Sequence, residues 1–262
     1  MKSMKTTNKR RSATVTSIQS IILSLITIMS LSQSATAASS ETQSVTIEIK
    51  PGKVYEIAAL WVKPEKREEL QSYFQKAMPI AVKHGARPLA GFKLARASIG
   101  DFNPTQLGLA EWPSERAFEE FLNDPEAKVL FPIRDGALEK MSVSHTTMIP
   151  PGSYTFKDGK IYEFAFLWVK AGKGDQLQKY FHVVKPLAHS KHGCSSVCGM
   201  QGLAPRSGSL DAHMVGITEW ASLQQFDGFI KDPEAASHFP ERDGALDKLQ
   251  VSHFTVLLPP KK

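Results

Sequence analysis

The chain has 262 residues, of which 42% are hydrophobic, and a formal net charge of +6. Residues 1–37 carry five of the positive charges and no acidic residue, so the remainder has a net charge of only 6 − 5 = +1. In that remainder Lys and Arg are interspersed with Asp and Glu, which excludes the basic face that nucleic-acid binding requires. The two cysteines exclude a disulfide framework, so apolar burial must stabilise the fold.

Residues 1–38 have the pattern of a secretory signal peptide. A basic segment at residues 2–11 precedes an apolar run at residues 18–31, and residues 35–37 form an A-x-A cleavage signal. We expect cleavage near Ala37/Ala38 and a periplasmic or secreted protein. The apolar run is too short and too rich in Ser and Thr for a membrane span, so no stable span is expected after cleavage.

The rest of the chain contains an internal duplication. Residues 54–74 read VYEIAALWVKPEKREELQSYF, and residues 161–181 read IYEFAFLWVKAGKGDQLQKYF. Downstream, residues 124–127 and 232–235 both read DPEA. Two copies are too few for a solenoid, so we expect two similar domains, residues 44–151 and 154–260, that bury a shared face as a symmetric dimer does.

Each copy is predicted to begin with a β-hairpin. Strand-like segments at residues 45–49 and 54–62 flank Pro51-Gly52 in the first copy. In the second copy, Asp158-Gly159 lies between residues 154–156 and 161–169, and Asp-Gly between apolar runs is a strong hairpin signal.

A helix, two strands, a second helical segment and a last strand follow in each copy. Apolar residues recur at helical spacing over residues 70–81 and 177–188, before Gly85 and Gly193. Ser114 and Ser222 are predicted helix caps. The strands are expected at residues 89–98, 107–112 and 141–149, and at residues 197–203, 214–220 and 249–258.

This order predicts an α+β fold made of two ferredoxin-like units, each βαββαβ plus the leading hairpin strand. The helices of such a unit cover one face of its antiparallel sheet and leave the other bare. The two bare faces are therefore expected to pack sheet to sheet in a barrel-like core. A monomer with this internal pseudo-dimer and a homo-oligomer are both compatible with the sequence.

Several shared segments resemble the dimeric α/β-barrel superfamily. They are the Tyr-x-x-x-x-x-Trp-Val-Lys strand, the Tyr-Phe helix ending in Lys-His-Gly, the Glu-Trp strand end, and the tail with Asp-Pro-Glu-Ala and Arg-Asp-Gly-Ala-Leu. That superfamily includes antibiotic-biosynthesis monooxygenases, NIPSNAP proteins and DUF1330 domains. The resemblance implies a small-molecule cleft between sheet and helices. It is also compatible with cofactor-free oxygenases, isomerases, haem-handling enzymes and proteins without known chemistry.

Two histidines and two glutamates are the candidate catalytic residues. His145 and His253 lie in the last strand of each copy, where an enclosed imidazole could act as a general base or be a buried, hydrogen-bonded side chain. Glu111 and Glu219 end a strand, where a carboxylate could act as acid or base or pair with a basic residue such as Arg134 or Arg242. Candidate substrate-binding residues are the aromatic and basic side chains Trp112, Trp220, Phe74, Phe181, Arg134 and Arg242.

One connection in the second copy collects possible metal ligands. His189, His192, Cys194 and Cys198 suit copper or zinc, although their spacing matches no standard zinc motif. A Cys194–Cys198 disulfide and free buried thiols are the alternatives. No cofactor is expected, and neither a metal nor haem has support beyond these observations.

The sequence thus favours an exported protein that binds or transforms a small, aromatic-like molecule. With the resemblance, a cofactor-independent monooxygenase or an isomerase is the implied enzyme class. The alternative is a noncatalytic structural or interaction module, as expected of DUF1330-like or NIPSNAP-like proteins without known chemistry.

Overall fold

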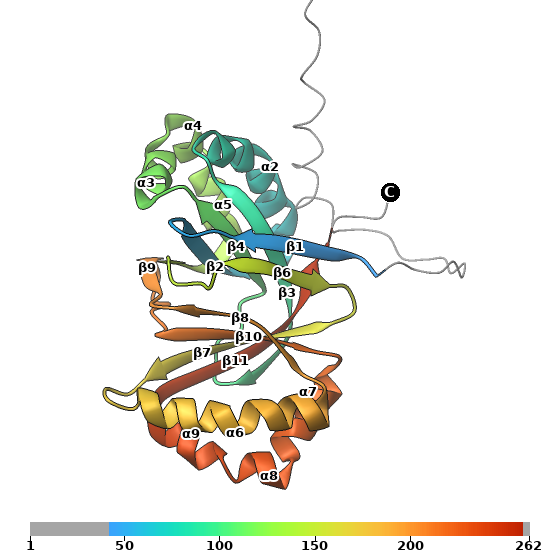
Figure 1. Ribbon diagram of the computed structural model, residues 1–262. Coiled ribbons are helices and arrows are strands. Elements are labelled where there is room, and N and C mark those ends of the chain that lie inside the picture. The colour runs from blue at the N-terminus through green and yellow to red at the C-terminus, as the bar shows by residue number, and fades with distance from the viewer. Residues whose placement is uncertain (1–41, 259–262) are drawn as a thin grey trace, which may run out of the picture.

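The computed structural model describes residues 42–258 (Figure 1). The predicted signal peptide, residues 1–38, lies outside the described residues. Within residues 42–258, no helix is long and apolar enough to cross a membrane.

Both repeats have the predicted order of elements. The first contains β2 (Val54–Val62), the 3-10 helix η2 (Pro64–Lys66), α2 (Arg67–Lys83), β3 (Arg87–Ile99), β4 (Gln106–Trp112), α3 (Glu115–Asn123), α4 (Pro125–Lys128), α5 (Phe131–Ala137) and β5 (Leu138–Thr146). The second contains β7 (Ile161–Val169), α6 (Gly174–His192), β8 (Ser195–Gln201), β9 (Ala204–Ser207), β10 (Met214–Trp220), α7 (Leu223–Lys231), α8 (Pro233–Ala236), α9 (Phe239–Ala245) and β11 (Leu246–Leu257).

The strands of both repeats form one continuous antiparallel sheet. Its order is β8-β10-β7-β11-β3-β4-β2-β5-β9, so each repeat contributes the strand order of a ferredoxin-like unit. Strand β11 of the second repeat pairs with β3 of the first, and β5 of the first pairs with β9 of the second. Because β9 follows β8 directly along the chain, these contacts close the sheet into a barrel. The helices of the two repeats lie on opposite sides of the barrel (Figure 1).

The predicted opening hairpins do not form. Strand β1 (Ser44–Ile49) pairs with β6 (Gly152–Lys157), the leading strand of the other repeat, rather than with β2. The chain does turn at Gly52 and Gly159, with φ of 74° and 73°, but each turn leads into the barrel instead of folding back along its own strand. The hairpin prediction was wrong because turn chemistry specifies a local reversal and does not specify which strand becomes the hydrogen-bonding partner.

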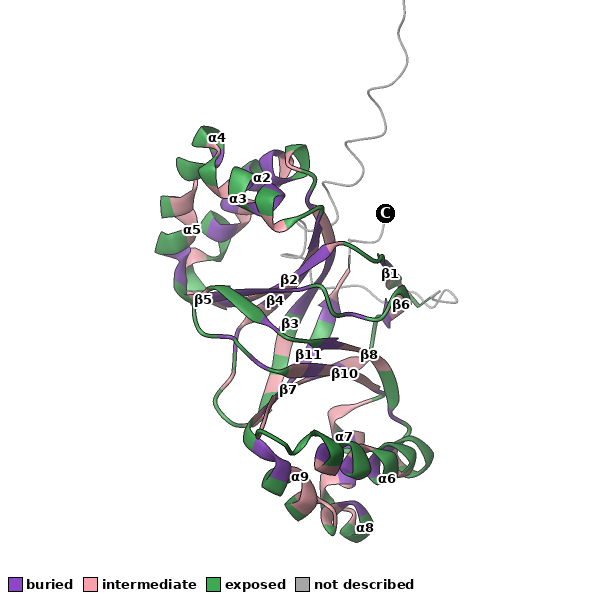
Figure 2. Ribbon diagram, turned by 60° about the vertical axis from the view of Figure 1, so that its left-hand side comes forward, coloured by how far each residue is buried: buried purple, intermediate pink, exposed green. Residues whose placement is uncertain are grey.

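The barrel interior is filled by apolar side chains from both repeats. Phe92 of β3 has no exposed surface, and its ring centroid lies 4.9 Å from that of Phe156 and 5.0 Å from that of Phe164. Ile47 and Ile49 of β1 belong to the same buried cluster. Figure 2 shows buried residues on the strands between the two helical layers. The interior is therefore a shared hydrophobic core.

The short helices begin at the predicted caps. The Ser114 side chain accepts a hydrogen bond from the backbone N–H of Ala117, and Ser222 accepts the equivalent bond from Gln225. These bonds satisfy N–H groups at the helix start that have no partner within the helix. They fix the position at which α3 and α7 leave the sheet.

The shared core predicts that the two repeats unfold together. We expect Phe92→Ala to lower the free energy of unfolding by about 3–5 kcal/mol, because it leaves a cavity where a ring of the first repeat packs against aromatic rings of the second. Urea denaturation followed by tryptophan fluorescence and circular dichroism should give one transition, shifted to lower urea. Val129→Ala is the control, because Val129 is 71% exposed. Two separate transitions, or equal losses in both variants, would contradict a common core.

Candidate functional site

A Glu, a Trp and a His come together on the helix-facing side of the sheet in each repeat. In the first, Trp112 Nε1 donates to Glu56 Oε2 at 3.0 Å, and the same carboxylate oxygen lies 3.5 Å from His145 Nε2. In the second, Trp220 Nε1 donates to Glu163 Oε2 at 3.1 Å, and His253 Nε2 lies 3.6 Å from that oxygen.

The two histidines are buried equally but differ in their other hydrogen bond. His145 is 1% exposed and His253 is 0% exposed. Phenylalanines of α3 and α7, Phe118 and Phe226, pack against the imidazoles at centroid distances of 4.5 and 4.2 Å. Among residues 42–258, neither Nε2 atom has a hydrogen-bond partner, and the nearest glutamate oxygens lie at 3.5 and 3.6 Å. The two sites therefore differ in the residue that is hydrogen-bonded to the histidine Nδ1 atom.

A β-bulge places a different residue next to each histidine. In the β3–β11 pairing, Val251 lies opposite Ile99 and Ser252 opposite Ala97, so Ser98 is the extra residue. In the β5–β9 pairing, Val143 lies opposite Ser207 and Ser144 opposite Pro205, so Arg206 is the extra residue. A bulge redirects the side chain of the extra residue. The bulge residue of each site thus comes from the other repeat.

In the second repeat the bulge residue connects His253 to the surface. Ser98 Oγ lies 2.9 Å from His253 Nδ1, and Arg96 Nε donates to Ser98 Oγ at 3.0 Å. Because Glu163 accepts only, the Nε2–H tautomer of His253 suits the carboxylate, and Nδ1 can then accept the Ser98 hydroxyl hydrogen. Arg96, Ser98 and His253 thus form a hydrogen-bonded polar chain, and the Glu163 carboxylate lies 3.6 Å beyond its inner end.

In the first repeat the histidine lies between two carboxylates. His145 Nδ1 is 2.8 Å from Glu115 Oε2, and Arg206 Nε is 3.5 Å from the same oxygen. Arg206 Nη2 also donates to Glu119 at 2.9 Å, and its guanidinium lies 5.8 Å from the Phe118 ring centroid. The Glu115 and Arg206 side chains therefore occupy the place that Ser98 takes in the second repeat.

A cavity of about 340 Å³ opens beside the second histidine. Its lining comes from β3 of the first repeat and α7 of the second, and consists of Arg96, Ala97, Ser98, Ile99, Phe226, Asp227, Ile230 and Lys231. Ser98 and Phe226 contact both the cavity and His253. The imidazole thus lies behind the part of the cavity wall that Ser98 and Phe226 form.

Comparisons with known proteins found one matching family model and several solved structures of similar fold. The model of a domain of unknown function, DUF1330, matches residues 53–145. An anthrone oxidase-like protein is 12% identical, with a TM-score of 0.54 over 83% of this chain and 98% of that one. A putative monooxygenase from Lactobacillus acidophilus NCFM is also 12% identical, with a TM-score of 0.46 over 78% of this chain and 94% of that one. The search of curated proteins found no match.

The protein has the fold of a dimeric α/β barrel, and its two repeats take the places of the two subunits. The solved structures are too distant in sequence to show more than this fold, and the DUF1330 match covers the first repeat. The fold expected from the shared sequence segments is therefore confirmed, and the DUF1330 match supports the resemblance over the first repeat.

Glu111 and Glu219 lie near one end of the barrel strands and belong to a different polar cluster from the histidines. Glu111 Oε2 accepts from Arg87 Nη2 at 2.6 Å and from the Tyr55 hydroxyl at 3.2 Å. Burial disfavours its charged form, but the Arg87 hydrogen bond and charge outweigh burial and lower the pKa of Glu111 from 4.5. The arginine that pairs with Glu111 is thus Arg87, not Arg134.

The second glutamate has a weaker partner. Glu219 accepts from the Tyr162 hydroxyl at 3.1 Å, while Lys160 Nζ is 3.8 Å from its other oxygen. The basic partner of Glu219 is therefore Lys160, and the expected pairing with Arg242 does not form. Burial raises the pKa of Tyr162, so this hydroxyl stays a hydrogen-bond donor.

The residues predicted to bind substrate do not line the cavity beside His253. Trp112 and Trp220 instead orient Glu56 and Glu163. Phe74 and Phe181 pack beside Tyr73 and Tyr180 on α2 and α6.

The two predicted arginines are engaged with neighbouring side chains. Arg134 lies over Tyr73 and Phe131 and pairs with Asp135, and Arg242 repeats these contacts with Tyr180, Phe239 and Asp243. These contacts hold α5 against α2 and α9 against α6, outside the barrel.

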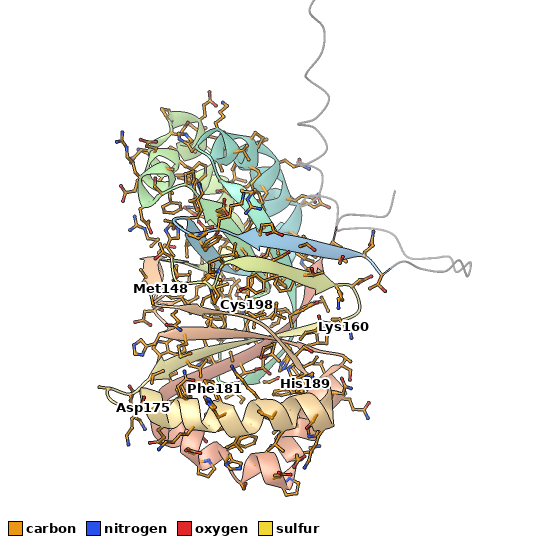
Figure 3. All side chains as sticks on the ribbon, viewed as in Figure 1. Met148, Lys160, Asp175, Phe181, His189 and Cys198 are labelled. Carbon is orange, nitrogen blue, oxygen red and sulfur yellow. The ribbon has the colours of Figure 1, made fainter. Side chains whose placement is uncertain are left out.

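The predicted metal set does not assemble. Within residues 42–258, no group of three or more His, Cys, Asp or Glu side chains could hold a metal ion. His189 Nδ1 bonds to the Cys194 carbonyl at 2.8 Å, and His192 Nε2 bonds to Asp232 at 3.0 Å. In Figure 3, His189 lies on α6 and Cys198 lies among the strands.

The alternative disulfide does not form either. Both cysteines are free. Cys194 packs in the cluster between α6 and the sheet, whereas Cys198 packs against the barrel interior. The two thiols therefore lie on opposite sides of the sheet, where a disulfide cannot form without moving the backbone.

Several residues of the site were missed in the sequence, among them two glutamates and two residues of β3. Glu56 and Glu163 had a usable signal, because each is a charged residue at the same place in an otherwise apolar strand of both copies. Arg96 and Ser98 had none, because they belong to the first repeat and meet His253 only through the β3–β11 pairing.

The Glu111 cluster predicts an acid-dependent loss of stability. We expect Glu111→Gln to cost about 1.5–3 kcal/mol at pH 7, the range for hydrogen bonds to charged groups. The pKa of Glu111 is lower in the folded protein than the ordinary value of 4.5. Its contribution to the free energy of unfolding is therefore complete above pH 4.5 and is lost as the pH falls through the folded pKa. Chemical denaturation from pH 7 to 3 measures this. The matched variant Glu219→Gln should lose less free energy of unfolding. Equal losses in the two variants that do not change with pH would contradict the stabilising Arg87–Glu111 pair.

The free thiols predict slow chemical modification of the native protein. Burial raises the pKa of Cys194 to about 11 and that of Cys198 to about 12, so little reactive thiolate is present at pH 8. Labelling with a thiol-specific chromogenic disulfide should therefore be slow in buffer and rapid in urea, where both cysteines react. Failure to react in urea without reductant would indicate a disulfide after all.

Proposed function

We propose that this protein binds a small molecule with an apolar body in the cavity between β3 and α7 and catalyses a proton transfer on it. The observation that carries the proposal is the 2.9 Å contact between Ser98 Oγ, which lines the cavity, and the buried Nδ1 of His253. That contact connects a binding surface to a base that water does not reach.

The cavity is open to solvent, and its volume reaches the range of small-molecule sites. Its volume of about 340 Å³ is at the lower end of the range for ligand pockets, about 300–1,000 Å³. Phe226, Ile230 and Ile99 provide apolar contact, while Ser98 and Arg96 provide polar groups. One or two rings would fill such a space.

The polar chain behind the cavity can accept and return a proton. A ligand that loses a proton to Ser98 Oγ causes the hydroxyl hydrogen to move to His253 Nδ1. The resulting imidazolium directs its Nε2–H toward Glu163, which stabilises the positive charge, and Trp220 holds that carboxylate in place. Returning the proton to the same or another atom of the ligand completes the cycle.

This chemistry is common to the two enzyme classes expected from the sequence. An isomerase returns the proton to a different carbon, and in a cofactor-independent monooxygenase the electron-rich anion reacts with dioxygen. The name of one structural neighbour, an anthrone oxidase-like protein, suggests anthrone as the first compound to test. We also propose that the signal-like N-terminus exports the protein, so that this reaction takes place in the periplasm or outside the cell.

Proton exchange on a test compound measures the proposed activity directly. We expect the protein to accelerate deuterium exchange at the acidic C–H of anthrone, followed by NMR in D₂O, by about 10²-fold or more. Ser98→Ala and His253→Gln should abolish the acceleration while retaining the cooperative unfolding transition. Ser209→Ala is the control, because Ser209 is exposed in the loop between β9 and β10.

A thermal-shift screen of phenols, quinones and aromatic ketones extends the test to other ligands. A saturable rise in melting temperature that Ser98→Ala or His253→Gln alters supports the cavity as the site. No exchange and no shift with any compound would favour the alternative, a noncatalytic structural or interaction module.

A further inference from the structure

The cavity beside His253 carries an excess of positive charge. Arg96 and Lys231 line it together with one acidic residue, Asp227, so its formal charge is +2 − 1 = +1. The remaining wall is largely apolar. A ligand that matches this lining has an apolar body and one negative charge.

Arg96 presents the geometry with which a guanidinium recognises a carboxylate. Its Nη1 and Nη2 atoms donate to the two carboxylate oxygens of Asp227 at 3.1 and 2.7 Å. Such paired bonds are specific for planar anions. Nε donates separately to Ser98, and the guanidinium lies 5.6 Å from the Phe226 ring centroid. The Arg96 side chain is therefore anchored at Nε, while its outer edge faces an exchangeable partner.

The bond to Asp227 can be exchanged for an equivalent one. The side chains of Arg96 and Asp227 are 33% and 44% exposed, so an entering carboxylate can reach Arg96 and form the same paired bonds. A ligand carboxylate that enters the cavity can therefore take the place of Asp227 without a large loss. The released aspartate side chain is free to turn into solvent.

The corresponding place in the first repeat has the opposite charge balance. Arg206 there contacts two carboxylates, Glu115 and Glu119, so the formal charge of the three groups is +1 − 2 = −1. Because both carboxylates already pair with Arg206, we expect no comparable anion site at that place. The difference makes the site beside His145 an internal comparison for the site beside His253.

We infer that the cavity binds a small carboxylate with an apolar or aromatic body, held by Arg96 in exchange for Asp227. This inference rests on the proposed ligand cavity and specifies its substrate class. A carboxylate bound at Arg96 places the ligand's body along Phe226 and Ile230, next to the Ser98 hydroxyl. Binding by Arg96 and proton transfer through Ser98 therefore use two side chains that are hydrogen-bonded to each other.

Matched anionic and neutral probes test the inference. Binding of benzoate and of benzamide to the mature protein would be measured by calorimetry at low ionic strength. We expect benzoate to bind more tightly than benzamide. Arg96→Gln should weaken benzoate binding by about tenfold or more and leave benzamide almost unchanged. Asp227→Asn should strengthen benzoate binding by about three- to fivefold, because the competing carboxylate is gone.

The control is the arginine of the other site. Arg206→Gln should change neither affinity, because Arg206 pairs with Glu115 and Glu119 in the first repeat and does not line the cavity. Circular dichroism would confirm that each variant is folded, and the Asp227→Asn result alone decides the inference if Arg96→Gln is unstable.

The outcomes separate this inference from the proposed function. Equal binding of benzoate and benzamide, unchanged by Arg96→Gln and Asp227→Asn, would overturn the anion preference and leave the cavity as a site for neutral ligands. Loss of benzoate binding in Arg206→Gln would also overturn it. If neither probe binds and anthrone exchange is absent, both the inference and the proposed function fail.

Discussion

The hydrogen bonding of β3 to β11 and of β5 to β9 is the constraint on which the rest of the structure depends. A ferredoxin-like unit alone has two unpaired sheet edges and one uncovered apolar face, and both promote association with another chain. Joining the two units edge to edge pairs those strands and encloses the apolar faces in one core. The barrel is thus the arrangement that satisfies the backbone and buries the apolar surface at the same time.

Closing the barrel also builds the site. His253 comes from β11, whereas Ser98 and Arg96 come from β3, so neither repeat alone contains the polar chain. The bulge at Ser98 brings its hydroxyl to the imidazole, while Glu163 and Trp220 lie on neighbouring strands of the second repeat. The site therefore depends on the same edge pairing that stabilises the fold.

The sequence allowed the order of elements, the helix caps and the ferredoxin-like pairing within each repeat to be predicted, because these depend on local periodicity and side-chain chemistry. The pairing of β1 with β6 could not be predicted, since a turn signal does not name a partner strand. Burial of His145 and His253 followed from their place in a covered strand. Ser98 could not be linked to His253, because that contact joins residues 155 positions apart through one bulge.

Duplication within one chain allows the two halves of this barrel to carry different residues at equivalent positions. In a homodimer, identical chains place the same residue at both bulges and beside both histidines. Here the two bulge positions hold Ser98 and Arg206, although the Glu-Trp-His set behind them is nearly identical. One half can thus connect its buried histidine to a cavity through a hydroxyl, while the other fills the equivalent place with an ion pair. A single substitution at a bulge therefore changes one site without disturbing the shared core.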